Sequence, residues 1–225
     1  MTENVKTLAI RGGEGGYLAL TWDDSHTVLV DAGYPNDIAE IEKALNEAGV
    51  KLEEITDLFI THHDLDHLGC VPEIRQKSPN LRIYAHPDEA PYLDGRQLPI
   101  KVANMLERYD KMDKGSQEFC DFWQDFCKKN PIETQPVHDG QILDMCGGIE
   151  VIHVPGHTPG HIVLHLKTSD IIVCGDAANV KDGVLTGANP VYTNDIPQAA
   201  ESFEKIKSYN AKGYITYHCG YLEAK

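Results

Sequence analysis

A dense group of metal-ligating side chains lies in residues 61–69, whose sequence is THHDLDHLG. The group directly follows the apolar run DLFI at 57–60, which predicts a buried strand. A loop at the end of a strand can turn several side chains toward one point. Imidazole and carboxylate groups together suit first-row transition metals, so this segment predicts a metal site. The candidate ligands are His62, His63, Asp64, Asp66 and His67.

Three later segments carry further candidate ligands. Residues 154–161, VPGHTPGH, form a Gly/Pro turn that holds His157 and His161. Two histidines in such a turn do not easily face one metal, so we expect one of them to support the site instead. Asp176 and His218 each follow a predicted strand. Taken in order with the first segment, these residues have the ligand count of a two-metal site.

The elements that position these residues repeat one plan. A strand, an aspartate, a helix, a second strand and a histidine occur in this order twice. Such a repeat predicts two pseudo-symmetric halves whose strand ends converge. The predicted elements are strands at 27–31, 57–60, 170–175 and 213–216, and helices at about 36–48 and 196–208.

Residues 98–130 interrupt this plan with two amphipathic patterns. Their apolar residues recur at helical spacing, and the second pattern is unusually aromatic. We expect a helical hairpin that either packs on the core or covers the site and supplies an apolar wall for a substrate. The first face consists of Val102, Met105, Tyr109 and Met112, and the second of Phe119, Phe122, Trp123 and Phe126.

The order THxxxDH, PGHTPGH, GDA and a late histidine resembles the metallo-β-lactamase superfamily of metallohydrolases. The resemblance implies an α/β fold, a four-layer αβ/βα sandwich, with the helical insertion at about 98–130. It also implies a single domain spanning 1–225 and two divalent metal ions per chain. Carried over to this chain, the family pattern assigns the first metal to His62, Asp64 and His157, and the second metal to Asp66, His67 and His218. Asp176 would bind both metals. Asp31 would support the ligands without binding a metal, and His161 would form a hydrogen bond within its turn.

Asp64 departs from the family pattern, which usually has His-x-His-x-Asp-His. His63 does not restore it, because adjacent residues on a loop point in different directions. Small bacterial members carry Asp at this position, and residues 175–193 also resemble theirs. The net charge of the centre is zero with Asp64, because two divalent ions are balanced by three carboxylates and one hydroxide. With a histidine at this position the net charge would be +1. We expect zinc first, and this oxygen-richer centre also admits manganese or iron.

The resemblance implies a metal-dependent hydrolase whose metal-bridging hydroxide cleaves a small ester, thioester, lactone or phosphoester. Asp66 is the candidate for orienting the nucleophile or accepting its proton. Asn179, Tyr192 and Trp123 are candidates for contacting the substrate. Two alternatives stay open: a diiron redox or oxygen-handling module related to flavodiiron proteins, which have a carboxylate at the position of Asp64, and a binding protein without turnover.

The composition of the chain limits which kinds of partner it can bind. The 225-residue chain has a net charge of −15 and no run of Lys or Arg, which argues against nucleic acid and anionic membranes. We find no signal-peptide pattern and no apolar run of the roughly 18 residues that a membrane span needs. The six cysteines form no CxxC pair, which favours reduced thiols. We therefore expect a cytoplasmic enzyme with a small-molecule substrate, and leave its oligomeric state open.

Overall fold

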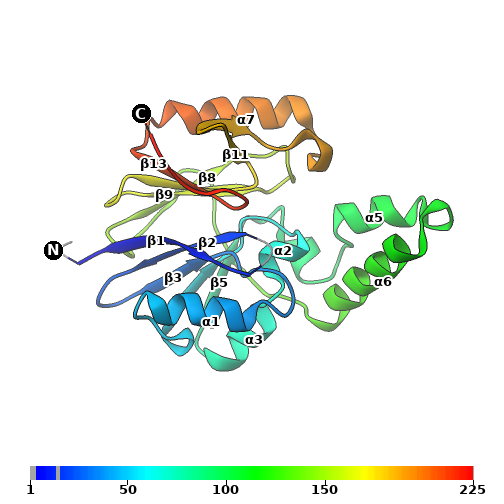
Figure 1. The fold of residues 1–225 in the computed structure, drawn as a ribbon, viewed down its shortest axis with the longest axis horizontal. Helices are drawn as coiled ribbons and strands as arrows, with labels where there is room; N and C mark the ends of the chain where they lie inside the picture. The colour runs from blue at the N-terminus through cyan, green and yellow to red at the C-terminus, as the bar shows by residue number, and fades with distance from the viewer. Residues whose placement is uncertain (1–3, 14–15, 225) are drawn as a thin grey trace.

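Two six-stranded sheets pack face to face, with helices on the outer face of each (Figure 1). The computed structural model describes residues 4–13 and 16–224, so both ends of the expected 1–225 domain lie outside it. Helices α1 (Ile38–Glu47) and α3 (Val71–Lys77) cover the first sheet, and α7 (Ile196–Ser208) covers the second. The predicted four-layer αβ/βα sandwich is confirmed.

The first sheet has the strand order β1-β2-β3-β4-β5-β6. Its first three strands are antiparallel neighbours, whereas β3 to β6 run parallel. The strands predicted at 27–31 and 57–60 are β3 and β4, and α1 connects them. The bounds are β1 Lys6–Arg11, β2 Tyr17–Trp22, β3 Thr27–Val30, β4 Asp57–Phe59, β5 Arg82–Ala85 and β6 Gln135–Pro136, with α2 Leu65–Leu68 and α4 Ala90–Leu93 between strands.

The second sheet has the order β14-β13-β10-β9-β8-β7. Strands β10 and β13 are parallel neighbours, and α7 crosses between them after the hairpin β11–β12. The second half thus repeats the plan of the first, as the sequence predicted. The bounds are β7 Ile142–Leu143, β8 Ile149–His153, β9 Ile162–Leu166, β10 Ile171–Gly175, β11 Ala178–Lys181, β12 Val184–Gly187, β13 Gly213–Thr216 and β14 Gly220–Glu223.

Alternating side chains of the inner strands build two apolar layers at once. In β3, Leu29 packs with the helices below the sheet, whereas Val28 and Val30 pack against the opposite sheet. This follows from the two-residue period of a strand. The strands read as continuous apolar runs because both of their faces are buried.

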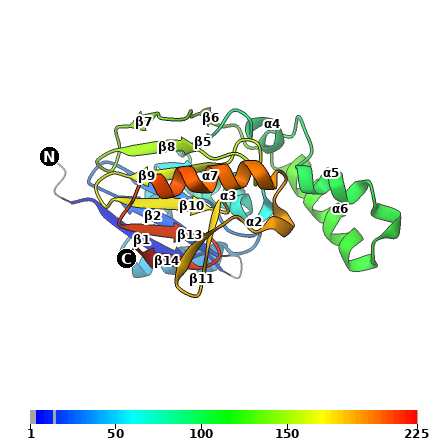
Figure 2. The same ribbon diagram turned by 90° about the horizontal axis from the view of Figure 1, so that it is seen from above.

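The helical insertion projects from one end of the sandwich (Figures 1 and 2). It contains α5 (Ile100–Leu106) and α6 (Lys114–Lys129). The Asp113 side chain caps α6 by accepting a hydrogen bond from Ser116 N at 3.0 Å. The two ends of the insertion meet where Ile132 N donates to Leu93 O at 2.8 Å.

The first helix of the insertion is shorter than its apolar pattern predicted. Helix α5 ends at Leu106, and a 3₁₀ turn follows at Tyr109–Lys111. Two hydrogen bonds fold this turn back onto α6: Gln117 Nε2 donates to Tyr109 O, and the Tyr109 hydroxyl donates to Asp121. Tyr109 still packs against the core, so the pattern predicted burial correctly although the helix breaks.

Candidate metal centre

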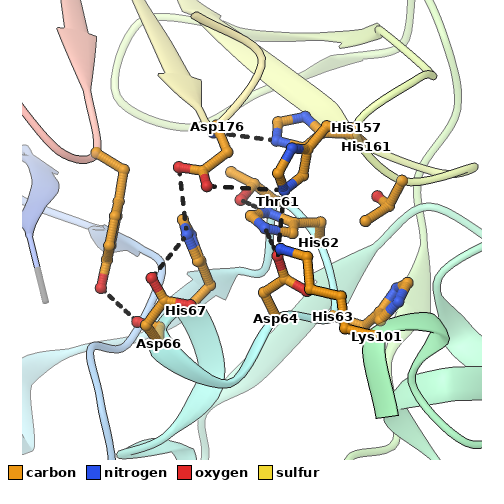
Figure 3. A network of polar contacts seen from close by, with 12 residues as sticks. Thr61, His62, His63, Asp64, Asp66, His67, Lys101, His157, His161 and Asp176 are labelled. Atoms are coloured by element: carbon orange, nitrogen blue, oxygen red, sulfur yellow. Dashed lines mark hydrogen bonds and ion pairs between the residues drawn. The ribbon is translucent and has the colours of Figure 1, made fainter. Parts of the chain in front are cut away.

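The segment after β4 divides its side chains between a loop and a short helix. Asp64 precedes α2 in extended backbone, with φ −74° and ψ 145°. His62 and Asp64 therefore come from the loop, whereas Asp66 and His67 come from the first turn of α2. Figure 3 shows Asp64, Asp66 and His67 around a space that His157 and Asp176 border from the other sheet.

A first group of donors consists of His62, Asp64, His157 and Asp176, all of them buried. Asp64 Oδ2 lies 3.1 Å from His62 Nε2 and 3.1 Å from His157 Nε2. His157 Nε2 lies 3.7 Å from Asp176 Oδ2. The position that departs from the family pattern therefore faces the same point as the two histidines.

A second group consists of Asp66, His67 and His218, and it also faces Asp176. His67 Nε2 lies 3.6 Å from Asp66 Oδ2 and 3.5 Å from Asp176 Oδ1. His218 Nε2 lies 3.3 Å from Asp176 Oδ1. Asp176 thus faces His157 with Oδ2 and His67 with Oδ1, and both of its oxygens lie 3.3 Å from His218 Nε2.

The spacing of these donors fits divalent metals. Ligands about 2.0–2.2 Å from a tetrahedral ion stand roughly 3.3–3.6 Å from one another, close to the distances in both groups. Within the described part of the chain, the buried atoms Asp64 Oδ1, His67 Nε2 and Asp176 Oδ1 have no hydrogen-bond partner. Unpaired buried polar atoms are costly, so they indicate a cation between them.

Asp31 and Thr61 orient two of the histidines. Asp31, which has a positive φ of 64°, faces His67 Nδ1 with its Oδ2 at 2.8 Å. The Thr61 hydroxyl donates to Asp31, so it accepts from His62 Nδ1 at 3.0 Å. Both assignments leave the Nε2 lone pairs of His62 and His67 facing the centre. A carboxylate that accepts a hydrogen bond from the second ring nitrogen of a metal-binding histidine is common in metal sites. Here Asp31 orients His67 directly and His62 through the Thr61 hydroxyl.

His161 lies behind the first group instead of joining it. Its ring stacks on His62 with centroids 4.7 Å apart, and its Nε2 accepts a hydrogen bond from Asp176 N at 3.2 Å. Gly175, at φ 49°, allows this approach, because a Cβ there would lie 2.8 Å from Thr61 Oγ1. The structure therefore places His161 where it holds Asp176, as expected of a supporting residue.

His63 points away from both groups. Its ring is paired with Glu89 and stacks on Tyr92 at 4.2 Å. The other Glu89 oxygen accepts from Thr158 Oγ1 at 2.6 Å and Gly160 N at 2.7 Å. Glu89 thus ties the loop after β4 to the Gly/Pro turn. The sequence analysis missed it, although it follows the end of β5 as the ligands follow other strands.

Lys101, in the first turn of α5, is a second residue that the sequence analysis missed. Its ammonium makes a short contact with Asp64 Oδ2, the oxygen that faces His62 and His157. It also lies 5.3 Å from the centre of the Tyr192 ring. The insertion therefore adds a positive charge directly beside the first group, which no local pattern in the sequence signalled.

Tyr217 packs against the second group, on the ring of His67 and the backbone of Asp66. Its ring centroid lies 3.8 Å from that of His67, and its buried hydroxyl donates to Asp66 O. Its position next to His218 is the signal that could have identified it.

The balance of charge around the centre favours cations. Burial alone would lower the pKa of His67, but Asp31, Asp66 and Asp176 outweigh it and raise that pKa well above its ordinary value. Burial holds the pKa of His62 well below its ordinary value, so this imidazole is a neutral donor. Burial also raises the pKa of the Asp66 carboxyl. A metal ion bound here would take the place of the proton that the carboxylates stabilise on His67, because an imidazole must be deprotonated to bind a metal.

A cavity of about 670 Å³ opens over these groups. Trp123 and Phe119 of α6 line it, and so does Tyr192 from the loop before α7. Asn179 lies in β11, where its carbonyl accepts from Thr186, and it is not among the residues that line the cavity. Of the three residues expected to contact substrate, the structure brings Trp123 and Tyr192 to the site.

The described residues include no helix of the length and apolarity that crossing a membrane requires. All six cysteines are free, and none of them belongs to either donor group.

This fold and these two His/Asp groups define a class of metallohydrolases. A sequence profile of the metallo-beta-lactamase superfamily matches residues 12–218, and the chain belongs to that superfamily. The probable metallo-hydrolase YflN of Bacillus subtilis (strain 168) is 24% identical over 237 residues, covering 90% of this chain and 78% of YflN. A hydroxyacylglutathione hydrolase of Enterobacter sp. (strain 638) is 27% identical over 203 residues, covering 89% of this chain.

The chain spans 60% of the length of that Enterobacter relative, and 53% of a hydroxyacylglutathione hydrolase of Aliivibrio salmonicida. Among solved structures, the metallo-beta-lactamase family protein TTHA1429 from Thermus thermophilus matches with a TM-score of 0.74 at 19% identity, covering 97% of this chain and 74% of that one. TTHA1623, solved in a di-iron-bound form, matches with a TM-score of 0.67 at 20% identity, covering 96% and 93%.

Proposed function

We propose that this metallohydrolase is binuclear and cleaves a small ester, thioester, lactone or phosphoester. The observation that carries the proposal is the position of Asp176 between two donor groups. Its Oδ2 faces His157 at 3.7 Å, its Oδ1 faces His67 at 3.5 Å, and both oxygens lie 3.3 Å from His218 Nε2. A carboxylate shared in this way suits the bridge of a two-metal hydrolytic site.

Each side chain then has a defined task. His62, Asp64 and His157 hold one ion, and Asp66, His67 and His218 hold the other. When bound, the ions supply Lewis acidity and lower the pKa of water toward neutrality.

Asp66 is the candidate proton acceptor, because it is the most exposed of the three carboxylates that line the cavity, with 21% of its side chain exposed against 4% for Asp64 and 11% for Asp176. Burial raises its pKa, which favours proton uptake, and Tyr217 holds its backbone.

The donor chemistry bears on the metal. Zinc suits the four histidines, whereas the oxygen donors of Asp64, Asp66 and Asp176 also suit manganese or iron. Iron would fit the alternative of a redox or oxygen-handling module. The names of the hydroxyacylglutathione hydrolases support ester-like cleavage over that alternative. The single domain spanning 1–225 and the cytoplasmic location stay predictions.

Metal analysis combined with a substrate screen tests the proposal. We expect the protein purified without chelator to contain two zinc or manganese ions, and to hydrolyse at least one class of ester, thioester, lactone or phosphodiester. Asp176→Asn should remove both metals and the activity. His138→Ala, an exposed histidine outside both groups, is the matched control. Two irons with a visible absorption band and no hydrolysis would refute the proposal.

A further inference from the structure

One face of α5 borders the cavity with polar and charged side chains. Lys101, Asn104, Met105 and Arg108 all line it, at the spacing i, i+3, i+4 and i+7. Residues at this spacing share a helix face. Arg108 lies just beyond the end of α5, so the two cations stand one at each end of this face.

The two cations differ in what they contact. Lys101 is paired with Asp64 at the metal centre. The Arg108 side chain has no ion pair or hydrogen bond to any described residue, and it faces the cavity in a chain with a net charge of −15. Arg108 is therefore free to bind an anion that enters the cavity.

Apolar side chains line part of the cavity, beside its charged and polar residues. Phe119 and Trp123 form one wall. Val191 and Tyr192 also line the cavity, and they are 78% and 57% exposed. Exposed apolar residues that border a cavity mark a surface for an apolar part of a ligand.

We propose that the substrate is an acid with an apolar chain between its carboxylate and its scissile bond, and that Arg108 binds the carboxylate. This inference rests on the proposed hydrolytic function. Arg108 is seven positions along the chain from Lys101 at the centre, which at the rise of an α-helix corresponds to roughly 10 Å. An arginine can hold a carboxylate with two parallel hydrogen bonds, which fixes its orientation.

The chemistry of the step is ordinary ester hydrolysis. Water adds to the acyl carbon, the acyl–oxygen bond breaks, and the leaving group departs as an alcohol or phenolate. The remote carboxylate of the substrate is unchanged. Arg108 acts on binding and orientation and takes no part in the bond exchange.

Matched esters test the inference. Mono-p-nitrophenyl suberate carries a carboxylate at about the required distance, p-nitrophenyl octanoate has the same length without it, and mono-p-nitrophenyl succinate is too short. We expect wild type to favour the suberate ester over the octanoate ester in kcat/KM by about tenfold, the scale of a hydrogen-bonded charge pair. Arg108→Gln should abolish this preference, so that kcat/KM for the two esters becomes equal, and Arg108→Lys should restore part of it.

Lys111→Gln is the control, because Lys111 is an exposed cation of the same insertion that does not line the cavity. Equal kcat/KM for the suberate and octanoate esters, or a preference that survives Arg108→Gln, would overturn the inference while the hydrolytic function stands.

If the substrate screen finds no hydrolysis of any ester, thioester, lactone or phosphodiester, the proposed function fails, and calorimetry decides the inference. Suberate should then bind at least tenfold more tightly to wild type than to Arg108→Gln, and more tightly than octanoate does. Equal binding in these comparisons would overturn it.

Discussion

Replacing Lys101 by methionine should tighten metal binding at the group formed by His62, Asp64 and His157. The ammonium contacts Asp64 Oδ2, which is the oxygen that faces both histidines. A metal at this point must share the oxygen with the ammonium or displace it. Methionine keeps the unbranched, flexible chain and its packing but removes the charge.

The size of the effect follows from Coulomb's law. An ammonium and a divalent ion that share one oxygen lie about 4 Å apart, which costs about 2 kcal/mol at the dielectric of water and about 8 kcal/mol at an effective dielectric of 20. The Lys101 side chain is 25% exposed, so it can swing into the cavity and avoid much of this repulsion. We therefore expect the lower value, a roughly thirtyfold lower Kd.

Titration of the metal-free protein with zinc or manganese, followed by calorimetry, gives the two dissociation constants. In Lys101→Met the dissociation constant of the first site, which we expect to be the larger of the two, should fall. The dissociation constant of the second site should change little. Lys111→Met is the control for loss of a positive charge from the insertion. If Lys101→Met leaves both constants unchanged or weakens either site, the ammonium does not compete with a metal at Asp64, and the reasoning is refuted.

Three further outcomes are expected. Asp64→His should strengthen zinc binding at the first site, measured by elemental analysis after dialysis, and unchanged metal content in both Asp64→His and Asp64→Ala would exclude Asp64 as a ligand. Asp31→Asn should weaken metal binding by about 10- to 100-fold in a competition titration, because it removes the charge behind His67, and wild-type affinity would refute this role. Burial would raise the pKa of Glu89, but the contacts with His63, Thr158 and Gly160 outweigh burial and lower that pKa from its ordinary value of 4.5. The ionised Glu89 therefore stabilises the fold above about pH 4.5, and this stabilisation is lost as the pH falls through the lowered pKa. Glu89→Gln should therefore lower stability near neutral pH by about 3 kcal/mol and flatten the loss in acid, measured by urea unfolding across pH, whereas parallel curves for the two proteins would contradict it.

The sequence predicted the layers and the grouping of the candidate metal-binding side chains for a shared physical reason. Strands buried on both faces are continuous apolar runs, and the chemistry follows directly at their ends. Asp31, Asp176 and His218 were therefore visible without a structure. His161 was separated from His157 because one tight turn cannot direct two rings to one point, and the structure places it behind Asp176.

The residues that the sequence did not reveal act across long separations in the chain. Lys101 reaches Asp64 from an inserted helix, and Glu89 connects His63 to the turn at Gly160. Nothing in the residues beside them predicts these contacts, because only the folded topology brings them together. The break after α5 was hidden for the same reason, since Gln117 and Asp121 of α6 fix the turn that ends it.

The hydrogen bond between Ile132 N and Leu93 O has a consequence for how specificity can change. Because the insertion leaves and rejoins the sandwich at one point, its length and sequence can vary without moving the strands that carry the metal ligands. Long surface insertions also cost little loop-closure entropy. A different hairpin grafted between these two residues would replace the apolar wall and the Lys101 ammonium beside Asp64, while the other side chains of the two donor groups would stay in place. Substrate choice can therefore change through the sequence of this insertion, while the metal-binding side chains at the strand ends keep their positions.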